Sequence, residues 1–451
     1  MSEHWRDKHV LVLGLAKSGE AAAKLLHRHG ANVTVNDIVP YEENEQARKL
    51  EALGIEVICG SHPLHLLDRP FSFIVKNPGI PYTNPLVSAA EKKGIPVITE
   101  IELCQQLTDA PIVAVTGSNG KTTTTTLIYE MLKGEKHRPL IAGNIGTVAC
   151  EVAEKATKEE TLVIEVSSFQ LLGTIDFKPN VSVLLNLFDA HLDYHGTKEN
   201  YVAAKEKITA NQEEDDLFIY NADDPFVVSI AGRTKATLLP FSTKRVIEEG
   251  IYSDDRFIYY KKEPIIPLKE IALPGKHNVE NVLAAIGAAK AIGAASDEIV
   301  RVLRTFTGVR HRLQFVAEYE GRRFYNDSKA TNILATEKAL QSFQEPIVLL
   351  AGGLDRGNSF DELKPHLRNV RVLVAFGETK EKLAKTAKDA GVETIVFADW
   401  IEDAVESAYC HSNRGDVILL SPACASWDQY KTFEERGERF IRAVHKLTRS
   451  M

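Results

Sequence analysis

The sequence predicts an α/β protein built from three domains. Short apolar runs rich in β-branched residues alternate with amphipathic stretches of helical period through most of the chain, a pattern typical of parallel sheets covered by helices. The chain has 451 residues, about three times the usual domain length of roughly 150 residues. The runs also fall into three separate series, and we take each series as one domain.

The first series predicts five strands and ends near Leu103, which gives a domain over residues 1–104. Its runs are HVLVLGL, NVTVND, IEVICG, FSFIVKNPG and IPVITE. The first run leads into GLAKSGE, where Ala16 stands at the middle glycine of a G-x-G-x-x-G turn. Gly14 and Gly19 still allow a tight turn under a diphosphate, and Asp37 ends the next strand, where acidic residues meet a ribose or base. A purely structural turn and a nucleotide-diphosphate site remain equally open.

The second series predicts a central domain over residues 105–308. Its strands are PIVAVTG, TLVIEVSS, VSVLLNL and DLFIYNADD. Between about residues 250 and 276 the pattern changes to short strands, and the helical run NVENVLAAIGAAKAIG closes the unit.

The stretch VTGSNGKTTTTT, residues 115–126, predicts a phosphate-binding loop of unusual spacing. Only two residues separate Gly117 from Gly120, whereas the common phosphate loop has four between its first glycine and the Gly-Lys pair. A strand, a glycine turn and a helix start in this order point backbone N–H groups at an anion. Lys121 would neutralise phosphate charge and the Thr122 hydroxyl would complete a Mg²⁺ shell. The alternative is an ordinary β-α turn.

Acidic and imidazole side chains follow the next two strands. Glu165 lies near the end of the predicted strand TLVIEVSS, whose other residues are typical of a buried strand. Its carboxylate therefore needs a partner, either Mg²⁺ or a lysine. The stretch LFDAHLDYHG offers four further candidates without zinc spacing, most of them expected to be solvated and one of them a possible metal ligand: Asp189, His191, Asp193 and His195.

The third series predicts a domain over residues 309–451. The strands PIVLLAGG, VRVLVAFG, ETIVFAD and DVILLSPA recur at roughly 22 to 25 residues, the spacing of β-α units. The loops FYNDSKATN (324–332) and LLSPACASWDQYKTF (419–433) each follow an apolar strand. Such loops bind ligands in open α/β sheets, although either could be a set of helix caps.

Composition favours small-molecule partners. The net charge of −8 provides no basic face for nucleic acid. Charges interrupt the apolar runs of the first thirty residues, and no run reaches the ~18 residues of a membrane span. The cysteines are dispersed and odd in number, which argues against a disulfide framework and against a C-x-x-C metal site: Cys59, Cys104, Cys150, Cys410 and Cys424. We expect a cytoplasmic protein without membrane insertion.

The chain closely resembles the Mur ligase family along its full length. The motifs that carry the resemblance are GLAKSG, TGSNGKTT, EVSSFQL, AHLDYHG, YVAAKEKI, LPGKHNVENVLAA, HRLQFV, NDSKATN, AGGLDRGNSF and SPACASWDQYKTFEERG. The last motif is similar to the branch that adds D-glutamate, and the Asp-Asn-Pro-Arg signature of the diaminopimelate- or lysine-adding branch is absent. The resemblance implies a Rossmann-like first domain, a central P-loop-type mononucleotide-binding domain and a Rossmann-like last domain.

The implied activity is ATP-driven amide formation in peptidoglycan precursor synthesis. The carboxylate of UDP-N-acetylmuramoyl-L-alanine attacks the γ-phosphate of ATP, an acyl phosphate forms, and the amine of D-glutamate displaces phosphate. Two Mg²⁺ ions are implied as cofactors, and we expect a monomer.

The resemblance also implies the site residues. The catalytic set is Lys121, Lys205, His191 and Lys329. The ATP contacts are Gly117, Asn119, Gly120, Lys121, Thr122, Thr123, Asn278, Asn281, Arg312 and Asp327. The contacts to the UDP-substrate are Leu15, Ala16, Asp37, Gly79, Asn144, Gly146, Ser167, Gln170 and His191. The D-glutamate contacts are Thr331, Arg356, Ser426 and Phe433. The metal ligands are Thr122, Glu165, His191 and Lys205.

Two of these assignments come from the resemblance against the local pattern. Lys205 corresponds to the carbamylated lysine of the family, whereas the residues alone favour a solvated helix lysine beside Glu206. Arg356 stands near a position where many relatives have lysine. We expect it to bind a D-glutamate carboxylate.

Three other functions fit the sequence less well. A nucleotide-linked dehydrogenase would need the glycine fingerprint that Ala16 interrupts. A non-catalytic ATP-binding regulator would not need Lys205, His191 and the SPACASWDQ loop together. A ligase similar to folylpolyglutamate synthase would not be expected to carry this first domain.

Overall fold

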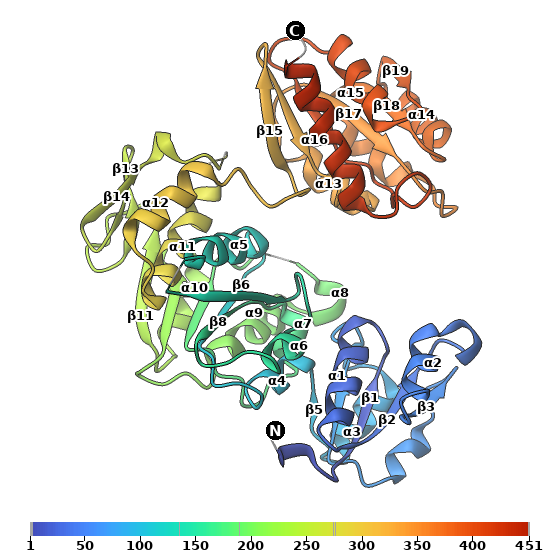
Figure 1. The fold of residues 1–451 in the computed structure, drawn as a ribbon, viewed down its shortest axis with the longest axis vertical. Coiled ribbons are helices and arrows are strands. Elements are labelled where there is room, and N and C mark those ends of the chain that lie inside the picture. The colour runs from blue at the N-terminus through green and yellow to red at the C-terminus, as the bar shows by residue number, and fades with distance from the viewer. Residues whose placement is uncertain (1–2, 135, 189, 274, 276, 450–451) are drawn as a thin grey trace. The chain divides into compact units, whose positions relative to one another are not determined.

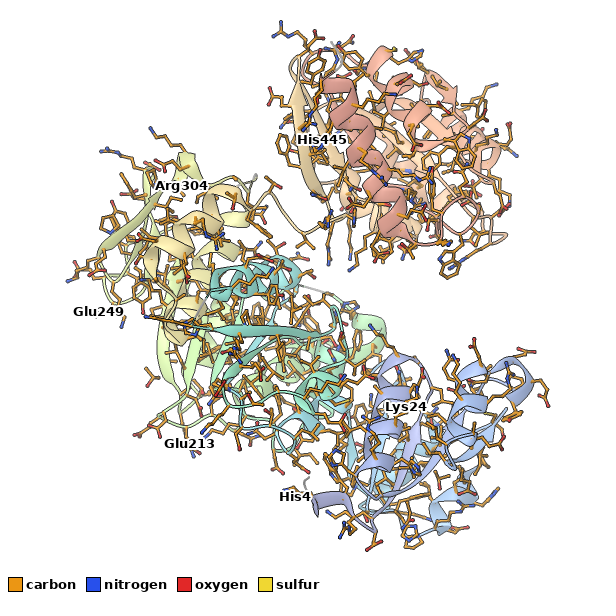
Figure 2. The ribbon with its side chains drawn as sticks, in the orientation of Figure 1. His4, Lys24, Glu213, Glu249, Arg304 and His445 are labelled. Carbon is orange, nitrogen blue, oxygen red and sulfur yellow. The ribbon has the colours of Figure 1, made fainter. Side chains whose placement is uncertain are left out.

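The computed structural model describes residues 3–134, 136–188, 190–273, 275 and 277–449. These residues contain three β-sheets with helices packed on them (Figure 1). They belong to two compact units, one of residues 1–271 and 275–305 and the other of residues 272–274 and 306–451. The first unit contains two sheets and the second contains one; Figure 2 adds the side chains. In the described part of the chain, no helix is long and apolar enough to cross a membrane.

The first sheet has five parallel strands in the order β3-β2-β1-β4-β5. This order matches five of the six strands of the Rossmann order 3-2-1-4-5-6 and confirms the predicted fold of the first domain. The strands are β1 (His9–Leu13), β2 (Asn32–Asp37), β3 (Glu56–Cys59), β4 (Phe73–Lys76) and β5 (Val97–Ile98). The helices are α1 (Lys17–Arg28), α2 (Glu45–Glu51), α3 (Pro85–Lys92) and α4 (Glu100–Cys104).

The second sheet has nine strands in the order β14-β13-β12-β11-β10-β9-β6-β8-β7. It is parallel from β7 to β12, and β13 and β14 pair antiparallel at one edge, where the sequence predicts short strands. The strands are β6 (Ile112–Thr116), β7 (Arg138–Gly143), β8 (Glu160–Glu165), β9 (Val181–Leu184), β10 (Leu217–Asn221), β11 (Thr237–Ser242), β12 (Ile251–Ser253), β13 (Phe257–Tyr260) and β14 (Glu263–Pro267). The helices are α5 (Lys121–Leu132), α6 (Ala149–Ala153), α7 (Ser168–Leu172), α8 (Leu192–His195), α9 (Lys198–Glu206), α10 (Pro225–Ala231), α11 (His277–Ile292) and α12 (Ser296–Thr305).

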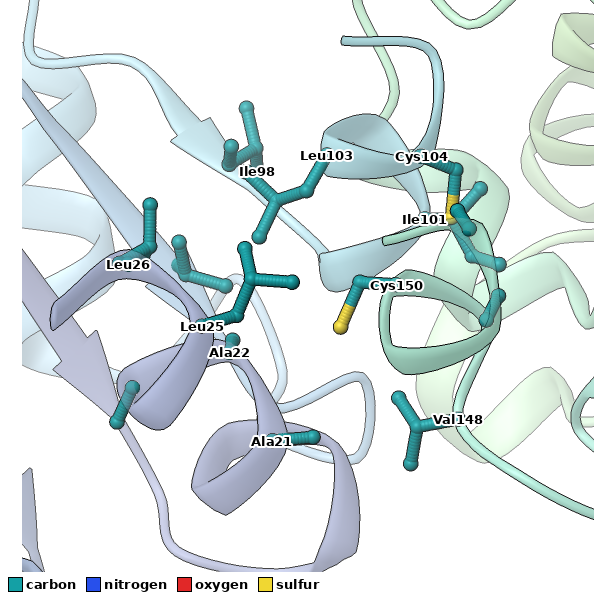
Figure 3. Packing of buried hydrophobic residues seen from close by; sticks show 14 of the residues in the cluster. Ala21, Ala22, Leu25, Leu26, Ile98, Ile101, Leu103, Cys104, Val148 and Cys150 are labelled. Atoms are coloured by element: carbon teal, nitrogen blue, oxygen red, sulfur yellow. The ribbon is translucent and has the colours of Figure 1, made fainter. Parts of the chain in front are cut away.

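One hydrophobic core joins the first two sheets. Leu25 and Leu26 of α1, Cys104 of α4 and Cys150 of α6 belong to a single buried cluster (Figure 3). Polar contacts supplement it, because the buried Glu102 accepts hydrogen bonds from the backbone N–H groups of residues 175, 176 and 177. A carboxylate that accepts several N–H groups tolerates burial.

The third sheet has six strands in the order β15-β16-β20-β17-β18-β19, parallel except for the edge strand β15. The strands are β15 (Gln314–Tyr319), β16 (Arg322–Asn326), β17 (Ile347–Gly352), β18 (Val370–Phe376), β19 (Thr394–Phe397) and β20 (Val417–Leu420). The helices are α13 (Ile333–Leu340), α14 (Lys380–Asp389), α15 (Ile401–Cys410) and α16 (Phe433–Arg449). Short 3₁₀ helices span Glu3–Trp5, Tyr41–Glu43, Leu64–Asp68, Lys207–Thr209, Leu268–Glu270 and Asp361–Asn369.

Candidate active site

The predicted phosphate loop connects β6 to α5. β6 is an interior strand of the second sheet, between β9 and β8, and both pairings are parallel. The loop that follows it therefore lies at the carboxyl edge of these strands, where α/β proteins bind ligands. The ammonium of Lys121 donates to the carbonyl oxygens of Gly117 and Ser118, at 2.7 and 3.0 Å, and so lies over the loop. Thr122 and Thr123 follow in the first turn of α5. This arrangement places a cation and a helix N-terminus together, as an anion site requires.

Two asparagines outside the loop hold its backbone. Asn186, which follows β9, accepts a hydrogen bond from the N–H of Asn119 through its side chain and one from the N–H of Ser118 through its carbonyl. Asn281 of α11 packs against Gly120, where an added Cβ would lie 2.0 Å from the Asn281 side-chain oxygen. Gly120 also has φ +82°, a conformation that only glycine adopts at little cost. The Asn281 amide donates to Asn278, the other predicted ATP contact on α11.

Thr122 and Glu165 meet beside the loop. The Thr122 hydroxyl donates to Glu165 Oε2 at 2.7 Å, and the Asn144 amide donates to Oε1 at 2.8 Å. Glu165 ends β8 and is only 2% exposed. Its carboxylate and the Thr122 hydroxyl are oxygen donors, which suit Mg²⁺. Among the described residues, no group of three or more His, Cys, Asp or Glu side chains is arranged to hold a metal.

Lys205 is a buried amine next to this pair, not a solvated helix lysine. Its side chain is 1% exposed and donates to the Thr116 hydroxyl at the end of β6, at 3.1 Å. Burial lowers the pKa of Lys205 well below its ordinary value; the nearby Lys121 lowers it further and Glu165 partly opposes this. Burial therefore shifts this amine toward its neutral form, which is the nucleophilic form.

Rings from the segment between β9 and α9 pack against Phe169 of α7. Phe169 contacts His191 and His195 at ring-centre distances of 4.9 and 5.5 Å. His191 has φ +56° and an exposed side chain, whereas His195 is buried with Nε2 3.0 Å from the Ser168 hydroxyl. A positive φ at a residue other than glycine is often found at functional sites. Asp189 and the side chain of Asp193, the other two candidates of this stretch, lie outside the described residues.

A cavity of 680 Å³ lies at the carboxyl edge of the first sheet. Leu15, Ala16 and Asp37 line it, all three predicted as contacts to the UDP-substrate. The Asp37 carboxylate accepts hydrogen bonds from the N–H groups of Leu15 and Val39, at 2.6 and 2.8 Å. It therefore holds the turn after β1 against the turn after β2. Asn77 also lines the cavity, accepts from the Gly79 N–H and donates to the Ser18 hydroxyl.

The remaining predicted contacts to the UDP-substrate lie around the second sheet. Gly146 accepts a hydrogen bond from Lys17 Nζ at 2.6 Å, which links it to the wall of the cavity. Ser167 caps α7, and the Gln170 side chain returns to the Ser167 N–H while donating to Glu100. Sequence reasoning missed Glu100, because its partners are distant along the chain.

In the second unit, Asp327 follows β16 and is buried. Its carboxylate accepts from the Ser421 hydroxyl at 2.9 Å and from the Leu313 N–H at 3.1 Å. Burial raises the pKa of Asp327 to about 7, and these hydrogen bonds and Arg312 only partly oppose the rise. The side chains of Arg312 and Lys329 are exposed, and Thr331 is half-buried.

The loops that carry the predicted D-glutamate contacts converge on the second unit's sheet edge. The Ser426 hydroxyl is buried without a hydrogen-bond partner among the described residues. Such a group is costly to leave unpaired and so points to a ligand. The exposed Arg356 guanidinium lies 5.1 Å from the Trp427 ring centre, and Phe433 opens α16. Sequence reasoning missed Arg436, a fully buried cation that donates to the Ser328 and Cys424 carbonyls and ties the two loops together.

Comparisons with known proteins agree with this geometry. Three family models match: the Mur ligase MurD-like N-terminal domain at residues 8–99, the Mur ligase middle domain at 115–289 and the Mur ligase glutamate ligase domain at 311–424. A relative from Geobacillus sp. (strain WCH70), named UDP-N-acetylmuramoylalanine--D-glutamate ligase, is 60% identical over 98% of each chain. The chain belongs to the Mur ligase family. A relative of the same name from Halalkalibacterium halodurans is 60% identical over 99% of each chain.

Solved structures of Mur ligases share the fold. UDP-N-acetylmuramate-alanine ligase from Thermotoga maritima matches with a TM-score of 0.54 and 19% identity, covering 97% of this chain and 99% of that one. The MurF ligase from the same organism, solved with ADP, matches with a TM-score of 0.53 and 19% identity, covering 99% and 97%. At this identity the likeness concerns the fold alone.

Proposed function

We propose that this chain joins D-glutamate to UDP-N-acetylmuramoyl-L-alanine at the expense of ATP. The observation that carries the proposal is the identity of 60% along nearly the whole chain with a relative named for this reaction. The grouping of Lys121, Thr122, Glu165 and Lys205 around one loop supports it, because a carboxylate and ATP repel each other unless positive charge is concentrated between them. The reaction would take place in the cytoplasm, as part of peptidoglycan precursor synthesis that growth and division require.

In the proposed reaction, a carboxylate oxygen of the substrate forms a bond to the γ-phosphorus and the bond to ADP breaks. The amine of D-glutamate then attacks the acyl carbonyl, phosphate leaves, and the amine gives up a proton. Lys121 and the backbone at the N-terminus of α5 would hold the phosphates in line for this displacement. Asn278, Asn281, Arg312 and Asp327 would contact the rest of ATP.

Mg²⁺ would be held by Thr122 and Glu165, and a second ion by His191 and a carbamylated Lys205. Bound Mg²⁺ neutralises charge on the transferring phosphoryl group. The burial of the Lys205 amine, which lowers its pKa, supports the carbamate. A neutral amine adds CO₂ and releases a proton, and the product is an anion that suits the ion. Lys205→Ala should then be nearly inactive, and a short carboxylic acid should restore part of the activity. Full activity of the variant in bicarbonate-free buffer would exclude the carbamate.

We further propose that each of three segments binds one substrate. Residues 1–104 would bind the UDP-substrate, residues 105–308 ATP, and residues 309–451 D-glutamate. The buried Ser426 hydroxyl, which has no hydrogen-bond partner in the described part of the chain, supports an amino-acid site in the last segment. Lys329, Thr331, Arg356 and Phe433 would complete that site, and the protein would act as a monomer. The test is product formation with each enantiomer of glutamate: D-glutamate should be joined, and equal use of L-glutamate would refute the assignment.

A further inference from the structure

His62 lines the same cavity as Asp37, and no role above is assigned to it. It lies in the turn that follows β3, and its side chain is half-buried. Its ring Nδ1 is 2.6 Å from the side-chain oxygen of Asn36, which is fully buried on β2.

The surroundings of Asn36 fix the proton on the His62 ring. The Asn36 amide nitrogen donates to two backbone carbonyls, those of Ile58 at 2.9 Å and Ser61 at 2.8 Å. Because carbonyl oxygens only accept, the amide cannot be turned round, and its oxygen must face His62. That oxygen also only accepts, so His62 Nδ1 carries the proton. In the neutral ring, Nε2 is then a hydrogen-bond acceptor.

The cavity suits a nucleoside at this acceptor better than a phosphate. Asp37 ends β2, the place where α/β proteins of this type contact the ribose or base of a nucleotide. A diphosphate at neutral pH offers acceptors but no donors, so it cannot pair with Nε2. The uridine half of a UDP-linked substrate offers donors of two kinds, the ribose hydroxyls and the uracil N3–H.

We infer that His62 is a substrate-binding residue whose Nε2 accepts a hydrogen bond from the uridine half, and that Asn36 positions it by fixing its tautomer. This inference rests on the proposed function for the identity of the ligand. It adds selectivity for the nucleoside, because an acceptor that the bound ligand covers and leaves unpaired penalises a ligand without the matching donor.

Two substitutions of His62 separate the two ring nitrogens. In His62→Asn the amide reaches the place of Nδ1 and can still donate to Asn36, but nothing replaces Nε2. In His62→Gln the side-chain oxygen reaches the place of Nε2 and restores an acceptor. In calorimetry with UDP as the probe, the Asn variant should bind on the order of tenfold more weakly and the Gln variant less than about threefold more weakly. Equal affinity of the Asn variant and the wild-type protein would overturn the inference.

Analogues of UDP identify the donor. If a ribose hydroxyl donates, 2′-deoxy-UDP or 3′-deoxy-UDP should bind the wild-type protein more weakly than UDP does. The His62→Asn variant, which already lacks the acceptor, should bind the analogue and UDP with nearly equal affinity. If the base donates, N3-methyl-UDP should behave in this way. The same loss for both proteins with all three analogues would refute the contact. UDP binding is measured without ATP or glutamate, so a failure of the ligase reaction would leave this result readable.

The tautomer can be read in the unaltered protein, which covers the case of a variant that does not fold. Ring ¹⁵N chemical shifts of histidine-labelled protein should show the Nδ1–H form for the neutral His62 ring. An Nε2–H form would overturn the inference.

Discussion

Replacing Glu100 with glutamine should stabilise the first unit above neutral pH. Glu100 begins α4, is 1% exposed, and its carboxylate accepts from the Gln170 amide at 3.0 Å and from the Cys150 N–H at 3.3 Å. Burial raises the pKa of Glu100 to about 7 from 4.5, and the two hydrogen bonds only partly oppose the rise. The folded chain therefore keeps this proton at pH values where the unfolded chain has lost it.

The sign and size follow from this shift. Between pH 4.5 and 7 the folded state binds more protons than the unfolded state, so the stability of the wild-type protein falls as pH rises. A shift of about 2.5 units corresponds to about 3 kcal/mol, fully expressed above pH 7 and absent below pH 4.5. Glu100→Gln removes this term. Its free energy of unfolding, relative to the wild type, should rise by up to about 3 kcal/mol across that interval. The amide nitrogen would face one N–H donor, either Gln170 or Cys150, and this cost is the same at every pH, so it lowers the curve without changing its pH dependence.

Urea unfolding at a series of pH values would measure the difference, followed through the fluorescence of Trp5, which is buried in the core that contains α4. Glu102→Gln is the matched control. Glu102 accepts three backbone N–H groups, and an amide nitrogen there would face donors, so this variant should lose roughly 1–3 kcal/mol. A Glu100→Gln variant less stable than the wild type at pH 8, with a difference that does not change with pH, would refute the reasoning.

Three further predictions concern the substrates. Lys121→Ala should lose nearly all turnover and still bind the UDP-substrate in calorimetry, and loss of that binding with ATP binding kept would contradict the assignment. Asp37→Ala should weaken binding of the UDP-substrate by about 1–3 kcal/mol, because two N–H groups lose their acceptor. An equal effect on the KM of ATP would count against a uridine site beside Asp37. Ser426→Ala and Arg356→Ala should raise the KM of D-glutamate far more than those of the other substrates in steady-state kinetics, and variants altered only toward ATP would oppose this.

The strands of the sheets were largely predictable, because a buried strand has a continuous run of apolar, β-branched residues that is visible in the local sequence. All five predicted strands of the first series are present, and the phosphate loop follows its strand as expected. Two strands of the second sheet, β7 and β11, were missed. Their sequences RPLIAG and TLLPFS contain proline and lack the long β-branched runs that mark the central strands.

The polar framework around the site was much less predictable. Asn186, Glu100 and Arg436 carry no local motif, and their partners lie 67, 70 and 108 residues away along the chain. Lys205 is a second example: its local sequence predicts a solvent-exposed lysine, whereas in the structure its amine is buried against β6. Long-range packing, which a sequence pattern does not encode, decides these contacts.

An oxygen-isotope experiment tests the central claim most directly. UDP-N-acetylmuramoyl-L-alanine labelled with ¹⁸O in the alanyl carboxylate would be incubated with the protein, ATP and Mg²⁺, with and without D-glutamate. If the carboxylate attacks the γ-phosphate, the attacking oxygen leaves with it, so phosphate should be released when all substrates are present and should carry one ¹⁸O atom. Release without label, or release from ATP that needs neither the UDP-substrate nor D-glutamate, would contradict the account.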